Sequence, residues 1–219
     1  MKVPDLFSAD LEPALNAWIA KFTSPEDLFS ALPQLYATLA SQAIEGTVEE
    51  TALLTGPVHI ARGAVVHAQV IIHGPSIVGP GAVINSHTEI RYGFIGSQCV
   101  IGHSASIIQS MVMNNSNIGA SAFIRNSVIG FGSVVGPGAA IGSIEVERAS
   151  TASSQSLSTL GAVLGDYSVV GANSTLKSGT IIGPHTVIGE GVLASGIYEP
   201  NQIVRLIPAL DIKARHDPS

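Results

Sequence analysis

Aliphatic residues recur every six positions over most of this chain, from Val48 to Ile188. Each member of the series is Val, Leu or Ile, and a glycine often follows it, as in Val78-Gly79. Four residues after the aliphatic position the side chain is usually small, as at Ala82. An internal period of this kind predicts a repeat architecture and outranks local secondary-structure preferences.

A unit of six residues is long enough for one short strand and one tight turn, and three such units close one triangular coil. Stacked coils then lie about 4.8 Å apart, like neighbouring strands of a sheet. The aliphatic side chains point into the prism and the small ones fill the remaining space. The sequence therefore predicts an all-β fold, a parallel β-helix, with these inward positions: 48, 54, 60, 66, 72, 78, 84, 90, 95, 101, 107, 112, 118, 124, 129, 135, 141, 164, 170, 176, 182 and 188.

The spacing shortens from six to five after Ile90, Ile107 and Ile124, which are three units apart. The shortening therefore falls at the same corner of successive coils, and Ile90, Ile107, Ile124 and Ile141 are predicted to stack in one column.

The repeat is interrupted once, over residues 143–163, starting from that same corner. This segment is polar and poor in repeats, which favours a protruding loop. A degenerate coil stays open as an alternative, because positions 146, 152, 158 and 164 keep the six-residue register.

Residues 1–43 follow a different pattern, with apolar residues at helical spacing. Ser24 and Pro25 form a typical helix start, a capping residue followed by proline at the first helical position. We expect two short amphipathic helices that form an N-terminal α-helical cap on the open end of the prism. The β-helix is predicted over 44–204, and 205–219 form a C-terminal tail.

Composition narrows the classes of function. The net charge of −6 disfavours a surface that binds nucleic-acid phosphates. Aromatic residues are only 5% of the chain, which suits a narrow core of aliphatic side chains. One cysteine excludes an internal disulfide, and neither a signal peptide nor a membrane-spanning run is recognisable. We expect a cytoplasmic protein without nucleic-acid or membrane partners.

Three stretches of the chain resemble a known family: Ile44-Glu45-Gly46-Thr47-Val48, VIGHSASIIQSMVMNNSNIG over 100–119 and LGAVLGDYSVVGANS over 160–174. The family is that of the bifunctional sugar-1-phosphate nucleotidylyltransferase/N-acetyltransferases, which includes the glucosamine-1-phosphate acetyltransferases. Their C-terminal β-helix is similar to roughly residues 44–204, and no nucleotidylyltransferase domain is present here.

The resemblance implies a left-handed coil and a homotrimer with parallel prism axes. It also implies acyl transfer from acetyl-CoA, or another acyl-CoA, to an amino- or hydroxy-sugar that is phosphorylated or linked to a nucleotide. No metal is expected, because a zinc site on this fold needs three histidines from facing subunits and no His-x4-His pair occurs.

The family's catalytic histidine aligns on Ala120, so a general base must come from elsewhere. His103 is predicted to lie in the same column as Ala120, one coil or about 4.8 Å away. His87, which lies one coil and one residue away from His103, is the second candidate. Four other histidines are interpreted as ordinary turn residues: His59, His67, His73 and His185.

Four residues are candidates for binding the acceptor. Asn114, Asn115 and Asn126 suit recognition of sugar hydroxyls, although asparagine also tolerates left-handed turns and a purely structural role stays open. Arg125 could bind a phosphate or a carboxylate. By resemblance, the coenzyme would lie along the later coils at Gly161, Ala162, Ala172 and Lys177.

Two functions therefore stay open. The first is an acyl-CoA-dependent sugar acyltransferase. The alternative is a non-catalytic β-helix relative that acts as a structural or regulatory subunit, because alanine occupies position 120.

Overall fold

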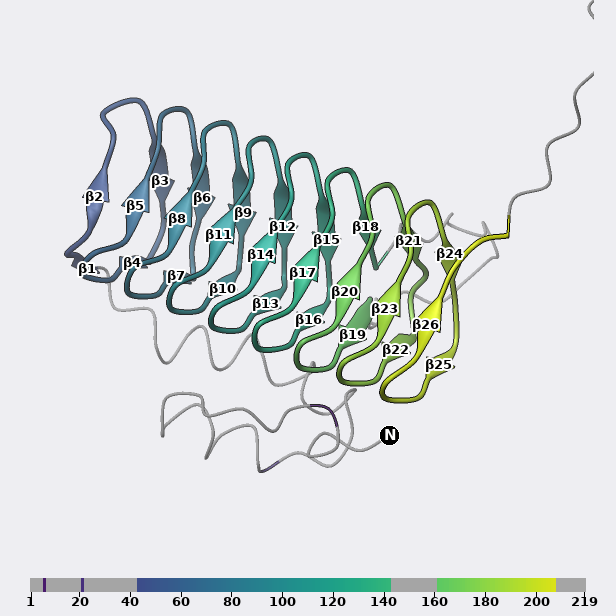
Figure 1. Ribbon diagram of the computed structural model, residues 1–219. Coiled ribbons are helices and arrows are strands. Elements are labelled where there is room, and N and C mark those ends of the chain that lie inside the picture. Colours follow the sequence, from purple (N-terminus) through teal and green to yellow (C-terminus); the bar gives the residue numbers. More distant parts are fainter. Residues whose placement is uncertain (1–5, 7–20, 22–42, 143–160, 208–219) are drawn as a thin grey trace, which may run out of the picture.

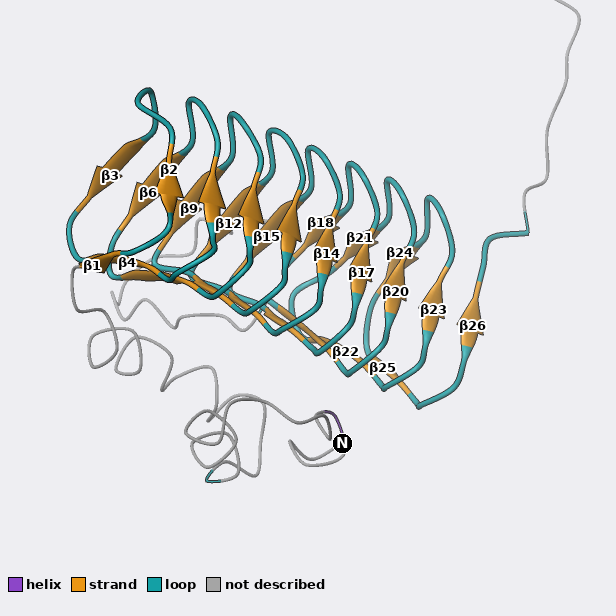
Figure 2. Ribbon diagram, turned by 60° about the vertical axis from the view of Figure 1, so that its left-hand side comes forward, coloured by secondary structure: helices purple, strands orange, loops and turns teal. Residues whose placement is uncertain are grey.

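The computed structural model describes residues 6, 21, 43–142 and 161–207. Within these residues the chain winds through three parallel sheets in about eight turns, so that successive strands belong to different sheets (Figure 1). Each strand has only two or three residues, because a turn must follow before the next side of the triangle begins (Figure 2).

Every complete coil contributes one strand to each sheet, and the last coil contributes only β25 and β26. Sheet A contains β1 (Ala43–Ile44), β4 (Val58–Ile60), β7 (Ser76–Val78), β10 (Phe94–Ile95), β13 (Met111–Val112), β16 (Val128–Ile129), β19 (Ala162–Leu164), β22 (Thr180–Ile182) and β25 (Ile197–Tyr198). Sheet B contains β2 (Thr47–Val48), β5 (Val65–Val66), β8 (Val83–Ile84), β11 (Val100–Ile101), β14 (Asn117–Ile118), β17 (Val134–Val135), β20 (Val169–Val170), β23 (Val187–Ile188) and β26 (Ile203–Val204). Sheet C contains β3 (Leu53–Thr55), β6 (Ile71–His73), β9 (Glu89–Arg91), β12 (Ser106–Ile108), β15 (Phe123–Arg125), β18 (Ala140–Ile141), β21 (Thr175–Leu176) and β24 (Leu193–Ala194).

The strand register confirms the predicted columns. In sheet B, Ile101 pairs with Ile84 on one side and with Ile118 on the other. In sheet C, Ile107 pairs with Ile90 and Ile124. The five-residue steps thus fall between sheet C and sheet A, at one corner of the prism.

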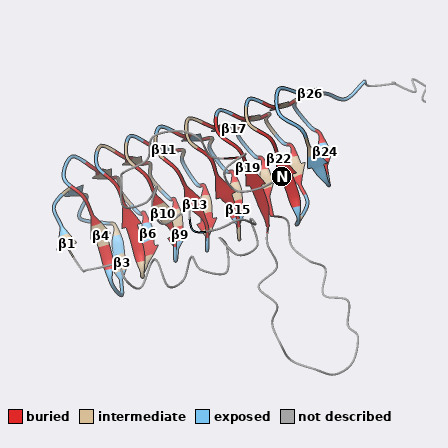
Figure 3. Ribbon diagram, turned by 90° about the horizontal axis from the view of Figure 1, so that it is seen from below, coloured by how far each residue is buried: buried red, intermediate tan, exposed pale blue. Residues whose placement is uncertain are grey.

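The predicted inward residues form the core. From Ile60 to Ile188 every one of them is buried, and Val48 and Leu54 of the first coil pack against the core while remaining half-buried. Small side chains such as Ala105 and Ala122 complete the filling. Figure 3 shows the resulting contrast between buried strands such as β13 and β19 and exposed turns.

Three edges run along the prism where one sheet turns into the next. We call them the A–B edge (for example 96–99 and 113–116), the B–C edge (85–88, 102–105, 119–122 and 171–174) and the C–A edge (91–93, 108–110, 125–127 and 177–179). Many turns hold one residue at positive φ, such as His87 at 63° and Asn115 at 59°. Backbone hydrogen bonds join the turns of neighbouring coils.

The interruption of the repeat is an insertion at the C–A edge, not a degenerate coil. Val128 of β16 pairs directly with Val163 of β19, and Ala140 of β18 pairs directly with Thr175 of β21. No additional rung therefore separates the coils before and after the insertion. The predicted loop over 143–163 is also too long at its C-terminal end, because Ala162 and Val163 belong to β19 and are buried.

Part of the outer face of sheet A is buried. Met111, Val128 and Val163 point away from the prism core, since they alternate with the inward residues, yet none has exposed surface. Leu6 is also fully buried, and its carbonyl accepts a hydrogen bond of 2.9 Å from the Asp166 N–H. The predicted helices of 1–43 otherwise lie outside the described residues, apart from positions 21 and 43.

Candidate functional site

His103 lies on the B–C edge, in the column predicted for it. The Ser121 N–H donates to the His103 carbonyl at 2.8 Å, and the Gly138 N–H donates to the Ala120 carbonyl at 2.9 Å. These bonds place the turns of His103 and Ala120 on neighbouring coils. The His103 side chain is exposed, so its imidazole is free to meet a ligand or a second subunit.

His87 occupies the preceding coil of the same edge and is also exposed. Its φ of 63° is the left-handed conformation that equivalent turn residues Gln69 and Ser104 adopt as well. The position is therefore set by the turn, and its backbone conformation gives no indication of a chemical role. No hydrogen bond between described residues orients the imidazole of His87 or of His103.

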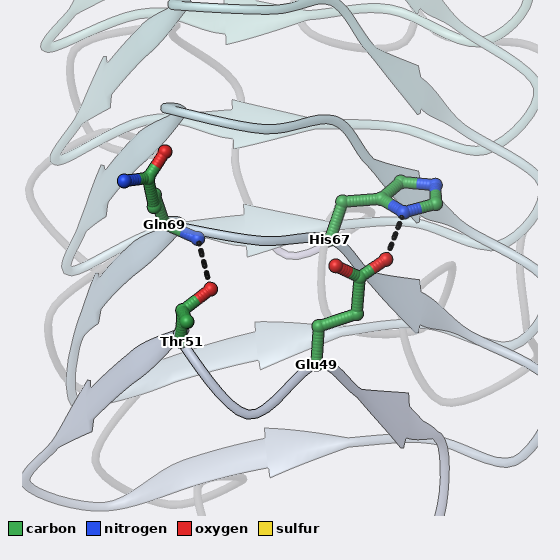
Figure 4. A network of polar contacts seen from close by, with 4 residues as sticks. All are labelled: Glu49, Thr51, His67 and Gln69. Atoms are coloured by element: carbon green, nitrogen blue, oxygen red, sulfur yellow. Dashed lines mark hydrogen bonds and ion pairs between the residues drawn. The ribbon is translucent and has the colours of Figure 1, made fainter.

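A third histidine on the B–C edge is oriented by a carboxylate, which sequence analysis missed. The Nδ1 of His67 lies 2.7 Å from Oε1 of Glu49, and both side chains are partly exposed (Figure 4). Next to this pair the Gln69 N–H donates to Oγ1 of Thr51 at 3.2 Å. Glu49 and His67 stand at the same position of successive coils, so their 18-residue spacing was the signal that could have found them.

Two of the remaining histidines are not turn residues, contrary to prediction. His59 lies in β4 and His73 lies in β6. Oγ1 of Thr55, on the preceding coil, is 2.6 Å from the His73 Nδ1. His185 is a turn residue at φ 55°, and its ring stacks on Tyr167 with centroids 5.2 Å apart.

Asn114 and Asn115 lie on the A–B edge, across the prism face from His103. The Asn114 Oδ1 accepts a hydrogen bond of 2.8 Å from the Ser97 N–H, which fixes the orientation of the amide. Asn115 is exposed and sits at the left-handed turn position. Asn115 and His103 therefore lie on different edges, with sheet B between them.

Arg125, Asn126 and Lys177 lie on the C–A edge. Arg125 pairs with Ile108, which pairs with Arg91, so the two arginines share one column, two coils apart. Both Arg125 and Lys177 are exposed. Lys177 follows Arg125 by two coils in that column, or about 10 Å at 4.8 Å per coil.

Gly161 and Ala162 mark the point where the chain returns from the insertion to the same edge. The Gly161 N–H donates to the Asn126 carbonyl at 2.6 Å, and the Ala162 N–H donates to Oγ of Ser127 at 2.9 Å. A Cβ atom on Gly161 would overlap the Arg125 carbonyl oxygen. Both residues are buried, so their direct contact with a coenzyme is not available in a single chain.

Ala172 lies half-buried on the B–C edge, apart from the other predicted coenzyme residues. The structure thus unites Arg125, Asn126 and Lys177 on one edge. It places His87 and His103 on a second edge with Ala172, and the Asn114–Asn115 pair on the third. A single chain does not bring the predicted acceptor residues and the predicted bases together.

The other chemistry-bearing groups offer little reactivity. Burial raises the pKa of the Cys99 thiol from its ordinary value of 9.0 to about 11, and its Sγ donates to the Met113 carbonyl at 3.0 Å. The described residues contain no group of three or more His, Cys, Asp or Glu placed to bind a metal ion. No helix among them combines the length and apolar character needed to cross a membrane.

Two family models match the β-helix. The model described as the GMPPB C-terminal domain matches residues 66–165, and the model described as bacterial transferase hexapeptide (six repeats) matches residues 161–195. The bifunctional protein GlmU of Picosynechococcus sp. is 29% identical over 147 residues. This match covers 65% of the chain and only 30% of the GlmU protein.

The solved structures that match have low sequence identity and TM-scores below 0.5. The UDP-N-acetylglucosamine acyltransferase of Francisella novicida is 14% identical, with a TM-score of 0.49, over 72% of this chain and 62% of that one. The acetyltransferase domain of PglB from Neisseria gonorrhoeae, solved in complex with acetyl coenzyme A, is 16% identical with a TM-score of 0.28. That match covers 84% of this chain and 63% of the PglB domain.

Proposed function

We propose that this chain, which is a hexapeptide-repeat protein similar to the bifunctional protein GlmU, transfers an acyl group from acetyl-CoA or another acyl-CoA to an amino- or hydroxy-sugar. The observation that carries the proposal is the C–A edge, where Arg125 and Lys177 form an exposed cationic column beside the return of the insertion. Guanidinium and ammonium groups on one column suit the phosphates of a coenzyme A or of a phosphorylated sugar.

The acyl carbonyl would be attacked by the amine or hydroxyl of the sugar while a base takes its proton. His103 is our candidate for this base, because its imidazole is exposed and unconstrained on the coil next to Ala120. His87 is the second candidate. The proton would then pass to the departing coenzyme thiolate, so that the thiol and the acylated sugar leave as products.

A complete site needs a second subunit, because the C–A and B–C edges of one chain are separated by the width of sheet C. We propose a homotrimer of left-handed prisms with parallel axes, in which the B–C edge of one subunit meets the C–A edge of its neighbour. Asn114, Asn115 and Asn126 would serve the sugar hydroxyls only from the subunit whose edge faces the cleft.

Sheet B is the face best suited to the contact between subunits. Its outward positions form one ladder of almost entirely β-branched aliphatic side chains without a charge, and Val100 and Val134 are each 40% exposed. The outward side chains of sheet A at Met111, Val128 and Val163 are buried, and sheet C carries Glu89 in its outward row. The ladder of sheet B consists of Thr47, Val65, Val83, Val100, Asn117, Val134, Val169, Val187 and Ile203.

Calorimetric titration with acetyl-CoA tests this proposal. We expect saturable binding that Lys177→Gln weakens by about tenfold or more, which is the loss of one charge-assisted hydrogen bond. Arg62→Gln is the matched control, since Arg62 is exposed on the A–B edge and should leave the affinity unchanged. The absence of heat and of a thermal shift at millimolar acetyl-CoA would refute coenzyme binding.

The second candidate function is a non-catalytic subunit that acts through its shape. Alanine at position 120 supports it, because the resembling family holds its base there. A stable trimer that binds neither acetyl-CoA nor free coenzyme A would favour this function over acyl transfer.

A further inference from the structure

The outward side chains of sheet C form a row between the B–C edge and the C–A edge. They alternate with the inward residues, and five of them on successive coils are Glu89, Ser106, Phe123, Ala140 and Thr175. Phe123 is the one aromatic residue among these five and is half-buried. Ser106 and Ala140, its neighbours in the row, have side chains too small to cover a face of its ring.

Arg125 lies on the same strand as Phe123 and on the same face. Both residues flank an inward isoleucine in β15, so both side chains point away from the prism core. Among the described residues no carboxylate pairs with Arg125 or with Lys177, which follows two coils further along the column. Arg91 of the same column is different, since its Nε donates to Oε1 of Glu89 at 2.6 Å. The cations without a counter-charge are therefore those beside and beyond Phe123.

The coil after Phe123 has only alanine and glycine at its outward positions. Ala140 pairs with Phe123, and Gly142 follows at the position of Arg125. Thr175 is two coils, or about 10 Å, from Phe123. A planar group stacked on an aromatic ring lies about 3.5–4 Å from it, so this spacing leaves room for one ring beside Phe123.

An aromatic ring and a cation on one face fit a ligand that carries a planar ring and an anionic group. Phe123 and Arg125 are two residues apart along the strand, which separates them by about 7 Å. The ribose of a nucleotide separates its base from its phosphate by a distance of this order. Every base has a π face that can stack on an aromatic side chain, and a guanidinium group suits a phosphate. A sugar phosphate without a base would use the cations and leave Phe123 without a contact.

We propose that Phe123 is a stacking platform for the base of a nucleotide whose phosphate is held by Arg125 and Lys177. The proposal rests on the function proposed above, because it names the part of the anionic ligand that the C–A edge recognises. Stacking and phosphate binding are common to coenzyme A and to a nucleotide-linked sugar, and the choice of probes separates these two sources. Phe123 thereby selects ligands that carry a base over plain sugar phosphates.

Calorimetric titration of the full chain with AMP, UMP and glucose 1-phosphate tests the proposal. Each probe carries one phosphate, so a difference in affinity reports the base. AMP stands for the adenosine end of coenzyme A and UMP for a uridine-linked sugar. We expect at least one of the two nucleotides to bind about fivefold or more tightly than glucose 1-phosphate, which is the usual gain from stacking one base.

Phe123→Leu should weaken binding of that nucleotide about fivefold or more and leave the affinity for glucose 1-phosphate unchanged. Phe94→Leu is the matched control, because Phe94 is another half-buried outward phenylalanine, on β10 of sheet A. Phe123→Tyr keeps the ring and should bind the nucleotide like the parent chain. Arg125→Gln should weaken all three ligands, because each of them has a phosphate.

The proposal is overturned if the three ligands bind equally, if none of them binds at millimolar concentration, or if Phe123→Leu binds the nucleotide like the parent chain. It is also overturned if Phe123→Tyr or Phe94→Leu weakens the nucleotide as much as Phe123→Leu does. Its failure differs from a failure of the proposed function. Binding of acetyl-CoA that Phe123→Leu leaves unchanged refutes the stacking platform alone. Binding of UMP through Phe123 in a chain that does not bind acetyl-CoA supports the platform and refutes coenzyme binding.

Discussion

Truncation of Ile118 measures how much of the stability comes from the inward columns. Ile118 has no exposed surface and lies in sheet B between Ile101 and Val135, with which it pairs. Ile118→Ala removes three carbon atoms, worth about 2.4 kcal/mol at roughly 0.8 kcal/mol for each buried methylene.

A cavity term adds to this loss, because the coils on either side are held apart by the backbone. The Gly102 N–H donates to the Ile118 carbonyl at 2.7 Å, and the Gly119 N–H donates to the Val135 carbonyl at 2.7 Å. Collapse around the missing side chain is therefore restricted. We expect a total loss of about 3–4 kcal/mol in the free energy of unfolding, inside the usual range of about 2–5 kcal/mol.

Urea denaturation followed by circular dichroism measures this loss, and the corresponding drop in Tm is roughly 6–16 °C. Leu193→Ala is the matched control, because it also removes three carbon atoms but from a side chain that is 61% exposed. Its cost should stay below about 1 kcal/mol. Equal costs for Ile118→Ala and Leu193→Ala would refute the assignment of Ile118 to a packed interior column.

Three further outcomes are expected. If acyl transfer is detected, His103→Ala should lower turnover by about 10²–10⁴-fold and leave the coenzyme affinity unchanged. An unaltered turnover would show that His103 is not the base. If the natural chain is inert and Ala120→His creates activity, the chain is a degenerate transferase. The Cys99 thiol should react with Ellman's reagent only after denaturation. The Cys99 thiol keeps its proton to higher pH in the folded chain than in the unfolded chain. The stability that this proton contributes is therefore complete below pH 9.0 and is lost as the pH rises toward about 11. Urea titrations across that pH range would measure the loss. Gly161→Ala should cost about 1–3 kcal/mol or more, measured by urea unfolding, because its Cβ would overlap the Arg125 carbonyl; a neutral effect would mean that the return from the insertion is not tightly packed.

The sequence by itself determined the columns of the prism. A period of six, with one five-residue step in three, specifies which residues meet on neighbouring coils, because every coil repeats the same path. The inward aliphatics, the stack of Ile90, Ile107, Ile124 and Ile141, and the turn column of His103 and Ala120 followed from counting alone.

The six-residue period could not decide whether residues 143–163 form a loop or an additional coil, because the six-residue register is kept in both cases. Only the direct pairing of β16 with β19 showed that no coil intervenes. The period also predicts nothing about which outward side chains are buried. Met111 and Val128 on the outer side of sheet A are buried, whereas Val100 and Val134 at the outward positions of sheet B are each 40% exposed.

The arrangement of the candidate site was likewise a matter of tertiary structure. Residues close in sequence, such as Asn115 and Arg125, turned out to lie on different edges, whereas Glu49 and His67, 18 residues apart, are in contact. One repeat unit of about six residues crosses the whole width of a face. One full turn, by contrast, returns the chain to a position one coil away, about 4.8 Å from where it started. Proximity in this fold therefore follows the coil and not the chain, and the direction of each side chain on an edge is settled only by the turn that carries it.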